Sequence, residues 1–475
     1  MNLDKDLQAR QEARTLAKAA KEAQLQLREF SQGQLDAIVE AVAKAFYESS
    51  VELAELAVRE TGFGNVPDKI TKNHFASRRV AEAVRNMKTV GILNENREEN
   101  LWEVAVPKGV IAAIVPSTNP TSTVCYKTII ALKAGNTIVF SPHPKALACT
   151  LRAAKIVAQA AEQAGAPKGS VGCLTIPSLD GCRELMGARE VNLILATGGP
   201  AMVKAAYSSG KPAIGVGAGN GPAYIHKSAD VSLALKQIAC SKNFDFGTVC
   251  ASEQSIIVER GMEKTLRETA VGMGYYFMDD REAGALEKLL FRPGGGLNPE
   301  IVGKPAGFLA EKAGFRVPGD TKILVAREEA AGPTRPYSME KLCPVLAFYV
   351  MDSEDAVLEK VVEVLSHEGA GHTFAIHTTD ENVVRKFAMK VPVSRFLVNA
   401  PAALGGIGAA TNLFPALTLG CGSVGGSSSA NNISPMDLLD IRKVAWGKEN
   451  PEQKRECNRE DIIEIIAAKI LERLK

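Results

Sequence analysis

The spacing of apolar residues changes from helical to strand-like near residue 109. Residues 3–88 read as helices, and one helical face is formed by Leu35, Ile38, Val39, Val42 and Phe46. Ser31 and Gln34 precede this face in the order of a capping box, which favours a helix start at that point. The N-terminal part of the chain is therefore predicted to be a helical bundle or a flanking helical layer.

From residue 109 onward, short apolar runs alternate with single helical segments. Strands are predicted in the runs GVIAAIVP, TIVFSP, SVGCLTIP, VNLILATG and KPAIGVG. The helices between them are predicted to end at Gly135 and Gly165 or to lie at about 179–187 and 200–209. Apolar strands that alternate with single helices form parallel strands with right-handed crossovers. We therefore predict an α/β fold with a doubly wound sheet, which binds ligands beyond the carboxyl ends of its strands.

A second α/β stretch begins after residue 222 and is long enough to form its own domain. Its strand candidates are SIIVE, TKILVA, VLAFYVM, HTFAIHT and SRFLVNA, and its helices are expected at about 228–239, 261–274, 281–291 and 354–366. LLDIRKVAWG has the alternating polarity of one last strand. The chain is accordingly divided into residues 1–222, 223–414, 415–448 and 449–475.

Composition limits the function classes that need to be considered. Apolar residues make up 46% of the 475 residues, charged residues 23%, and the formal net charge is +2, which favours neither nucleic acid nor an anionic membrane as a partner. No apolar run approaches the length of about 20 residues that a membrane span needs. The nine scattered cysteines form no C-x-x-C pair, so neither a disulfide framework nor a metal site is expected. These features predict a cytoplasmic protein.

Two loops that follow predicted strands carry groups suited to binding. The stretch Pro116–Pro120 contains Asn119, whose amide could donate a hydrogen bond to a developing oxyanion. Read alone, an asparagine in such a loop is more often a turn or cap residue. The stretch Ala196–Pro200 contains two glycines ahead of a helix, an arrangement that binds a pyrophosphate or simply makes a tight turn.

Two further stretches carry reactive or charged side chains. In FGTVCASEQ, small neighbours leave Cys250 accessible, as a nucleophilic thiolate requires, although buried free cysteines are the commoner case. In MEKLCPV, Glu340 and the following lysine enter an apolar strand, which indicates either a ligand contact or a solvated turn.

Together these four stretches resemble the aldehyde dehydrogenase superfamily over about residues 5–447. The resemblance implies that Cys250 is the nucleophile, Asn119 the oxyanion amide and Glu340 a contact of the nicotinamide ribose. It implies a coenzyme domain within 1–222, a catalytic domain at 223–414, and an oligomerisation strand within 415–448. The coenzyme-binding candidates besides Glu340 are Pro116, Ser117, Thr118, Ser141, His143, Thr197, Gly198, Gly199 and Gly217.

The departures from the family pattern point to one branch. Hydrolytic members carry a water-activating glutamate where this chain has VGAGNGP, residues 216–222, and SPHP replaces the usual ribose-binding lysine segment. These stretches and CASEQS resemble the CoA-acylating branch. The resemblance implies a reversible, ping-pong conversion of a short-chain aldehyde, NAD⁺ and CoA to acyl-CoA and NADH through a thioester on Cys250. His372 matches a histidine of acylating members and is the candidate base for the CoA thiol.

Several readings remain open from the sequence. Acetaldehyde and propionaldehyde are the leading substrates, and sulfoacetaldehyde is an alternative. A hydrolytic dehydrogenase that releases free acid is a rival with the same fold. A non-catalytic assembly protein is a rival of another class, which the presence of Asn119, Cys250 and Glu340 disfavours.

The last segment, REDIIEIIAAKILERLK, is predicted to be an amphipathic helix on a polar linker. Its apolar face comprises Ile462, Ile463, Ile466, Ile470 and Leu474. The face could dock on the protein's own oligomer, on a membrane or on another protein, and its mixed charges disfavour an anionic membrane. The segment resembles the encapsulation peptides of bacterial microcompartments, which implies a shell or co-cargo partner for residues 459–475. By resemblance the enzyme is expected to be a homodimer or homotetramer.

Overall fold

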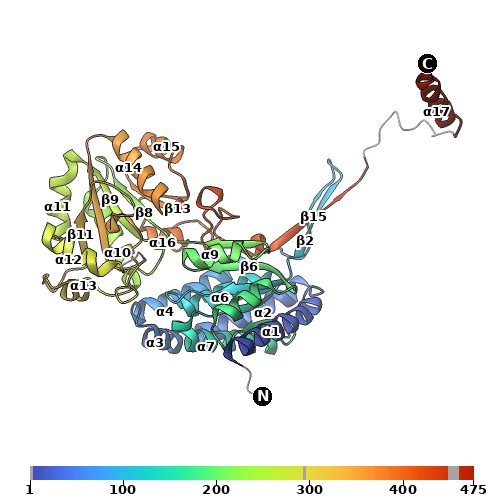
Figure 1. Ribbon diagram of the computed structural model, residues 1–475, viewed down its shortest axis with the longest axis horizontal. Coiled ribbons are helices and arrows are strands. Elements are labelled where there is room, and N and C mark those ends of the chain that lie inside the picture. Colours follow the sequence, from blue (N-terminus) through green and yellow to red (C-terminus); the bar gives the residue numbers. More distant parts are fainter. Residues whose placement is uncertain (1–3, 293–295, 448–458, 475) are drawn as a thin grey trace. The chain divides into compact units, whose positions relative to one another are not determined.

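The computed structural model describes residues 4–292, 296–447 and 459–474. The chain forms two compact units, one made of Met1–Val90 with Pro107–Asp440 and one made of Gly91–Val106 with Ile441–Lys475. Both parallel sheets lie in the first unit (Figure 1). Within the described ranges, every helix is too short or too polar to cross a membrane.

The N-terminal layer consists of helices, as predicted. They are α1 (Lys5–Leu27), α2 (Gln32–Glu48), α3 (Ser50–Thr61), α4 (Val66–His74) and α5 (Val80–Val84), with a π-helical turn at Phe75–Arg79. The capping box is confirmed, because the Ser31 side chain accepts from the Gln34 backbone and the Gln34 side chain accepts from the Ser31 backbone. The helix α2 packs against two helices that connect strands of the following sheet, whereas α1 packs directly against that sheet, so the N-terminal helices do not lie on one side of it only.

The predicted doubly wound sheet is confirmed. Its five parallel strands are β3 (Val110–Ile114), β4 (Thr137–Ser141), β5 (Val171–Cys173), β6 (Val191–Thr197) and β7 (Ala213–Val216), in the order β5-β4-β3-β6-β7. The connecting helices are α6 (Pro120–Lys133), α7 (Leu147–Gln163), α8 (Leu179–Gly187) and α9 (Pro200–Tyr207). The strand order reverses between β3 and β6, and ligands bind beyond the carboxyl ends at such a switch point.

The second parallel sheet has seven strands, in the order β10-β11-β12-β9-β8-β13-β14. They are β8 (Gly221–Ile225), β9 (Glu253–Glu259), β10 (Tyr275–Phe277), β11 (Ile323–Arg327), β12 (Val345–Met351), β13 (Gly371–His377) and β14 (Val393–Val398). The helices are α10 (Val231–Asn243), α11 (Glu263–Val271), α12 (Asp280–Leu290), α13 (Ala306–Ala313), α14 (Glu354–His367), α15 (Glu381–Ala388) and α16 (Ala402–Gly406).

Alternate residues of a single strand supply the two cores of this sheet. In β12, Val345, Ala347 and Tyr349 pack with α12, α13, α14 and α15, whereas Leu346 and Phe348 pack with α10 and α11. Both faces of the strand are therefore covered by helices. This explains why VLAFYVM is a continuous apolar run instead of an alternating one.

The second unit contains a hairpin that the sequence pattern did not predict. The strands β1 (Gly91–Asn96) and β2 (Leu101–Pro107) pair antiparallel, and β2 is followed in the sheet by β15 (Leu439–Ala445), the predicted last strand. The hairpin residues are mostly exposed or half-buried, so they lack the apolar run that signals a buried strand. Trp102 and Trp446 stabilise this sheet edge to face, with ring centroids 4.8 Å apart.

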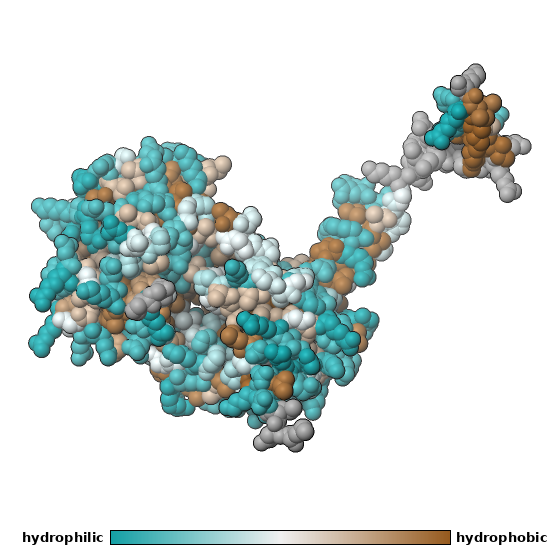
Figure 2. Space-filling view, viewed as in Figure 1, coloured by the Kyte–Doolittle hydropathy of each residue, from teal (hydrophilic) through white to brown (hydrophobic). Residues whose placement is uncertain are grey.

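The helix α17 (Arg459–Arg473) is the terminal helix that the sequence predicted. Figure 2 shows a band of hydrophobic side chains along it. Its exposed apolar residues are Ile462, Ile463, Ile465, Ile466, Ile470 and Leu471, and the exposed Leu474 follows directly after the helix. Residues 448–458 of the predicted linker lie outside the described residues.

Candidate active site

A cavity of about 560 Å³ lies where the loops that follow β3, β4, β6 and β7 meet the loop that precedes β9. All the candidate site residues except His372 line it. Apolar side chains complete the wall, namely Leu179, Met202, Val249, Leu342, Ile407, Leu417 and Leu419. The size and the mixture of apolar walls with few polar groups are those of a small-molecule site.

The end of β6 provides a surface suited to a dinucleotide phosphate. Gly198 and Gly199 directly precede α9, whose first residue is Pro200. An added Cβ on Gly199 would meet no atom within 4 Å, so the backbone is open to a ligand. The positive end of the helix dipole favours an anion at this place, and the residues present therefore fit a pyrophosphate group.

The loop that carries Cys250 has a strained backbone. Asp245 and Phe246 have φ values of 49° and 51°, and Gly247 follows with a φ of 78°. Non-glycine residues rarely adopt this left-handed conformation, so surrounding contacts must hold it in place. An added Cβ at Gly247 would also lie 3.0 Å from the Cys343 backbone, which explains why a glycine is needed there.

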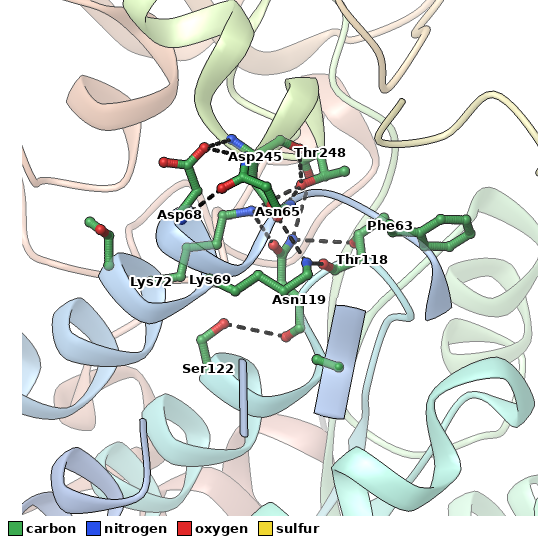
Figure 3. A network of polar contacts seen from close by, with 12 residues as sticks. Phe63, Asn65, Asp68, Lys69, Lys72, Thr118, Asn119, Ser122, Asp245 and Thr248 are labelled. Atoms are coloured by element: carbon green, nitrogen blue, oxygen red, sulfur yellow. Dashed lines mark hydrogen bonds and ion pairs between the residues drawn. The ribbon is translucent and has the colours of Figure 1, made fainter. Parts of the chain in front are cut away.

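The Asp245 side chain supplies the contacts that hold this loop. Its Oδ2 lies 2.9 Å from Lys69 Nζ and 2.6 Å from Lys72 Nζ, and its Oδ1 accepts from the Asn65 backbone at 2.8 Å. Figure 3 shows both lysines extending from α4 to this carboxylate. Because all three charges are buried, the ion pairs tie α4 firmly to the nucleophile loop.

Asn119, in the loop between β3 and α6, joins the same network. Its Oδ1 accepts from Lys72 Nζ at 2.6 Å, and its Nδ2 donates to the Thr248 carbonyl at 3.3 Å. These contacts fix which end of the amide faces the Cys250 loop. The predicted oxyanion donor and the predicted nucleophile are thus held close together by residues 119, 72 and 248.

The Cys250 thiol is partly exposed and is protonated at neutral pH in this arrangement. Burial, followed by the nearby Glu340 carboxyl, raises the pKa of Cys250 to about 12. Burial also raises the pKa of Glu340 to about 8. Because a carboxylate beside the thiol disfavours a second negative charge, Glu340 controls how readily the thiolate forms.

The VGAGNGP segment, residues 216–222, packs tightly against Glu340 and against the Cys250 backbone. The Gly219 backbone donates to Glu340 Oε1 at 2.9 Å. An added Cβ at Gly219 would lie 1.9 Å from the Cys250 carbonyl oxygen and 3.2 Å from His372 Nε2. Of the described residues that line the cavity, Glu340 alone carries a carboxyl group, and it is engaged by this loop.

His372 lies outside the cavity wall that the other candidates form. It is fully buried, its Nδ1 is 2.8 Å from Thr373 Oγ1, and its Nε2 has no hydrogen-bond partner among the described residues. Burial, and then the positive charge of Arg395, lower the pKa of His372 to about 3. The imidazole is therefore neutral, and the 217–220 loop contacts it.

Four polar residues of the cavity wall were not among the sequence candidates, namely Lys72, Thr123, Ser178 and Thr248, and of these Lys72 and Thr248 join the network around Asp245. Lys72 lies in the helical N-terminal region, where a lysine normally indicates a solvated face, so no local signal marked it. Thr248 was identified only as a small neighbour of Cys250, yet its hydroxyl contacts Lys72 at 2.9 Å. Only the three-dimensional contact with Asp245 distinguishes these residues from ordinary polar positions.

Comparison with known proteins identifies relatives over most of the chain. A family profile described as "Aldehyde dehydrogenase family" matches residues 5–273. The bifunctional aldehyde-alcohol dehydrogenase AdhE of Escherichia coli K12 is 45% identical over 92% of this chain and 50% of its own length. The chain thus spans about half the length of such curated relatives. Succinate-semialdehyde dehydrogenase (acetylating) of Clostridium kluyveri is 36% identical over 91% of this chain and 95% of its own.

Solved structures show the same fold. An acetylating aldehyde dehydrogenase from Geobacillus thermoglucosidasius has a TM-score of 0.92 at 46% identity, covering 94% of this chain and 99% of its own. A propionaldehyde dehydrogenase from a fucose-utilisation bacterial microcompartment of Clostridium phytofermentans has a TM-score of 0.83 at 30% identity, with coverage of 92% and 97%. Propionaldehyde dehydrogenase of Rhodopseudomonas palustris, with bound CoA and an acylated cysteine, has a TM-score of 0.82 at 28% identity, with coverage of 91% and 97%.

Proposed function

Because this chain belongs to the aldehyde dehydrogenase family, we propose that it converts a short-chain aldehyde and CoA to acyl-CoA with reduction of NAD⁺. The observation that carries the proposal is the absence of a water-activating carboxylate in residues 216–222, directly beside the Cys250 loop. A thioester formed on Cys250 is thereby protected from hydrolysis and remains for CoA. The acylated cysteine of the Rhodopseudomonas palustris relative supports the same course.

The first half-reaction uses Cys250 and Asn119. The Cys250 thiol first loses its proton to solvent, and the resulting thiolate attacks the aldehyde carbon. The carbonyl π electrons move to oxygen, forming a thiohemiacetal alkoxide. The Asn119 amide and the Cys250 backbone N–H donate hydrogen bonds to this oxygen. A nicotinamide coenzyme, when bound, would supply the hydride acceptor. Loss of the hydride from the former aldehyde carbon re-forms the carbonyl and leaves a thioester on Cys250.

In the second half-reaction, the CoA thiolate attacks the Cys250 thioester. The same donors hold the oxygen of the tetrahedral intermediate, which collapses to acyl-CoA and the Cys250 thiolate. Each step is a reversible thioester or hydride exchange, so the enzyme operates in both directions with ping-pong kinetics.

Glu340 is a poor base for hydrolysis at neutral pH. Its raised pKa of about 8 keeps the carboxyl mostly protonated, and Oε1 already accepts from Gly219. Water in the cavity therefore lacks an ionised carboxylate among the described lining residues. This supports CoA as the acceptor over water.

His372 is proposed as the base for the CoA thiol. Its unpartnered Nε2 is the acceptor that such a role needs, but it lies beside Gly219 and not on the cavity wall. The role therefore requires the 217–220 loop to shift after coenzyme leaves. Exposure of the ring to solvent would also bring its pKa back toward 6.5, where a base is useful near neutral pH.

The coenzyme contacts are assigned to the loops at the ends of β3, β4, β6 and β7. Gly198, Gly199 and the start of α9 would hold the pyrophosphate, and Glu340 would contact the nicotinamide ribose. The remaining contacts come from Pro116, Ser117, Thr118, Ser141, His143, Thr197 and Gly217. CoA enters the same cavity after reduced coenzyme departs. Acetaldehyde and propionaldehyde suit the apolar wall, with sulfoacetaldehyde as the polar alternative.

The proposal is tested by following the product and not only the coenzyme. Purified enzyme is supplied with acetaldehyde, propionaldehyde or sulfoacetaldehyde and NAD⁺, with and without CoA. We expect NADH and acyl-CoA in equal amounts, with sustained turnover only when CoA is present. Cys250→Ser, which keeps the size of the side chain, should lose nearly all turnover. Sustained release of free acid without CoA would overturn the proposal.

We further propose that α17 docks the enzyme to a microcompartment shell or co-cargo protein. Its exposed isoleucines and leucines form the kind of helical face that binds a groove on a partner. The name of the Clostridium phytofermentans relative connects this enzyme class with such a compartment. On this proposal the enzyme works as a homodimer or homotetramer inside a bacterial microcompartment in the cytoplasm.

A further inference from the structure

The buried ammonium of Lys72 makes three contacts that together use all of its N–H groups. Its Nζ donates to Asp245 Oδ2 at 2.6 Å, to Thr248 Oγ1 at 2.9 Å and to Asn119 Oδ1 at 2.6 Å. Figure 3 shows these groups converging from α4, from the Asn119 loop and from the nucleophile loop. One side chain thus links the predicted oxyanion donor to the predicted nucleophile loop.

The contact with Asn119 has a directional consequence. An amide has one acceptor end and one donor end, and Lys72 can only donate. The charged donor therefore selects the orientation in which Asn119 Nδ2 faces the Cys250 loop, where it now donates to the Thr248 carbonyl at 3.3 Å. The positive charge of the Lys72 ammonium, beside the amide oxygen, also draws electrons from the amide N–H groups and strengthens them as donors.

The neighbouring Lys69 provides an internal comparison. It lies one helical turn earlier on α4 and also contacts Asp245 Oδ2, at 2.9 Å. Its other contact is the Thr118 carbonyl at 3.0 Å, and no hydrogen bond to the Asn119 side chain is described for it. Lys69 therefore shares the structural ion pair with Lys72 but not the contact with the amide.

We infer that Lys72 is a positioning residue for the reaction, which holds and polarises the Asn119 amide so that Nδ2 stabilises the alkoxide on the Cys250 adduct. The inference rests on the proposed function for the identity of that alkoxide. Lys72 lies on the cavity wall, but its three N–H groups are taken up by Asn119, Thr248 and Asp245. Its effect passes through Asn119, and this distinguishes it from a residue that merely supports the loop.

A double-mutant cycle on the full-length enzyme tests the inference. NADH formation is measured with saturating aldehyde, NAD⁺ and CoA for Lys72→Met, Asn119→Ala and the double variant. We expect Asn119→Ala to lower kcat by about 100-fold or more and Lys72→Met by about 10-fold or more, with KM values changed much less. The double variant should be no slower than Asn119→Ala, because Lys72 has no amide left to position.

The matched cycle uses Lys69→Met with Asn119→Ala. Here the kcat losses of the two single variants should multiply in the double variant, because Lys69 contacts Asp245 and the Thr118 carbonyl and not the Asn119 amide. Multiplying losses in the Lys72 cycle would overturn the inference, and so would non-additivity of the same size in both cycles. Because the readout is NADH, a wild-type enzyme that makes free acid instead of acyl-CoA would overturn the proposed function while leaving this cycle interpretable.

A second variant guards against a folding failure of Lys72→Met. Glutamine ends one bond earlier than lysine, so Lys72→Gln cannot keep the 2.6 Å contact with Asn119 but still offers Asp245 a polar neighbour. The same non-additivity with Asn119→Ala is expected. Wild-type kcat in a folded Lys72→Gln protein would contradict the inference.

Discussion

At the scale of single residues, the reactivity of Cys250 depends on the charge of Glu340. Below about pH 8 the Glu340 carboxyl is mostly protonated, because burial raises its pKa to about that value. Above that pH it becomes a carboxylate and opposes the ionisation of Cys250. As the pH rises, ionisation of Glu340 therefore makes ionisation of the Cys250 thiol less favourable.

This coupling predicts the outcome of Glu340→Gln. At pH 9 the variant should react with iodoacetamide at Cys250 about two- to tenfold faster than the wild type, because the repelling charge is gone and one pKa unit corresponds to a tenfold change in thiolate. At pH 6 both side chains are neutral, so the two rates should be similar. The rate is measured by mass spectrometry of the Cys250 peptide, and equal rates at pH 9 would contradict the coupling.

Residue identities were predictable from the sequence only where a residue type and its neighbours are unusual together. Cys250 among small residues and Asn119 after a strand carry such signals. Lys72 does not, because its partners are 47 and 173 residues away along the chain. The buried position of His372 was equally unpredictable, since the burial of a histidine at the start of a strand depends on contacts from other elements.

At the scale of elements, the 217–220 loop packs tightly against the Cys250 backbone. It joins β7 of the five-stranded sheet to β8 of the seven-stranded sheet with no helix between them. No strand was predicted at Gly221–Ile225, so this direct link between the two sheets was not predicted. Its tight fit against the Cys250 backbone could not be predicted either, because a linear pattern contains no distances.

The fit predicts that Gly219→Ala is damaging. The added methyl group would overlap the Cys250 carbonyl oxygen, and overpacking of this kind costs about 1–3 kcal/mol in the free energy of unfolding. Displacement of the Cys250 backbone should also lower kcat by about 10-fold or more, given the sensitivity of catalysis to small misplacements. Steady-state kinetics and urea unfolding measure the two effects.

Gly217→Ala is the stability control for this variant. No atom lies within 4 Å of the added Cβ, so its unfolding free energy should stay within about 0.5 kcal/mol of the wild type. If Gly219→Ala matched the wild type in both stability and kcat, the loop would be more adaptable than its packing indicates.

The parallel sheets show why element prediction succeeded in some places and failed in others. Strands covered on both faces, such as β3 and β12, have continuous apolar runs that are visible in the sequence. The hairpin of β1 and β2 is exposed enough to retain charged residues, so it lacks that pattern. Short helices such as α15 and α16 were also not predicted, because a segment of eight or fewer residues shows little helical periodicity of its apolar positions.

At the scale of the whole molecule, catalysis and docking are assigned to separate units. The cavity is built entirely from residues of the first unit, whereas α17 belongs to the second. The two functions should therefore be separable by mutation. The four-part division of the chain made from the sequence stays a prediction.

Substitutions on α17 test this separation. Ile463 and Ile466 are 62% and 53% exposed, so Ile463→Glu with Ile466→Glu should leave NADH formation unchanged. When shell proteins are co-expressed, the fraction of enzyme that co-sediments with the shells should fall by about 10-fold or more, as expected when a central apolar anchor is lost. Ala468→Glu, on the opposite face of the helix, is the matched control and should retain association.

Loss of NADH formation in the α17 double variant would argue that the helix supports the fold or the oligomer. Normal co-sedimentation of the double variant would show that α17 is not the docking element. Size-exclusion chromatography of each variant, compared with the wild type, separates a change of oligomer from a loss of docking.

On the proposed mechanism, the thioester on Cys250 withstands water and is discharged by CoA. Intact-protein mass spectrometry, after the enzyme is mixed with aldehyde and NAD⁺ without CoA, tests this directly. We expect a burst of about one NADH per site, an acyl adduct on the Cys250 peptide, and loss of that adduct to acyl-CoA when CoA is added. Continuous NADH formation with free acid and an unmodified Cys250 in the absence of CoA would contradict it.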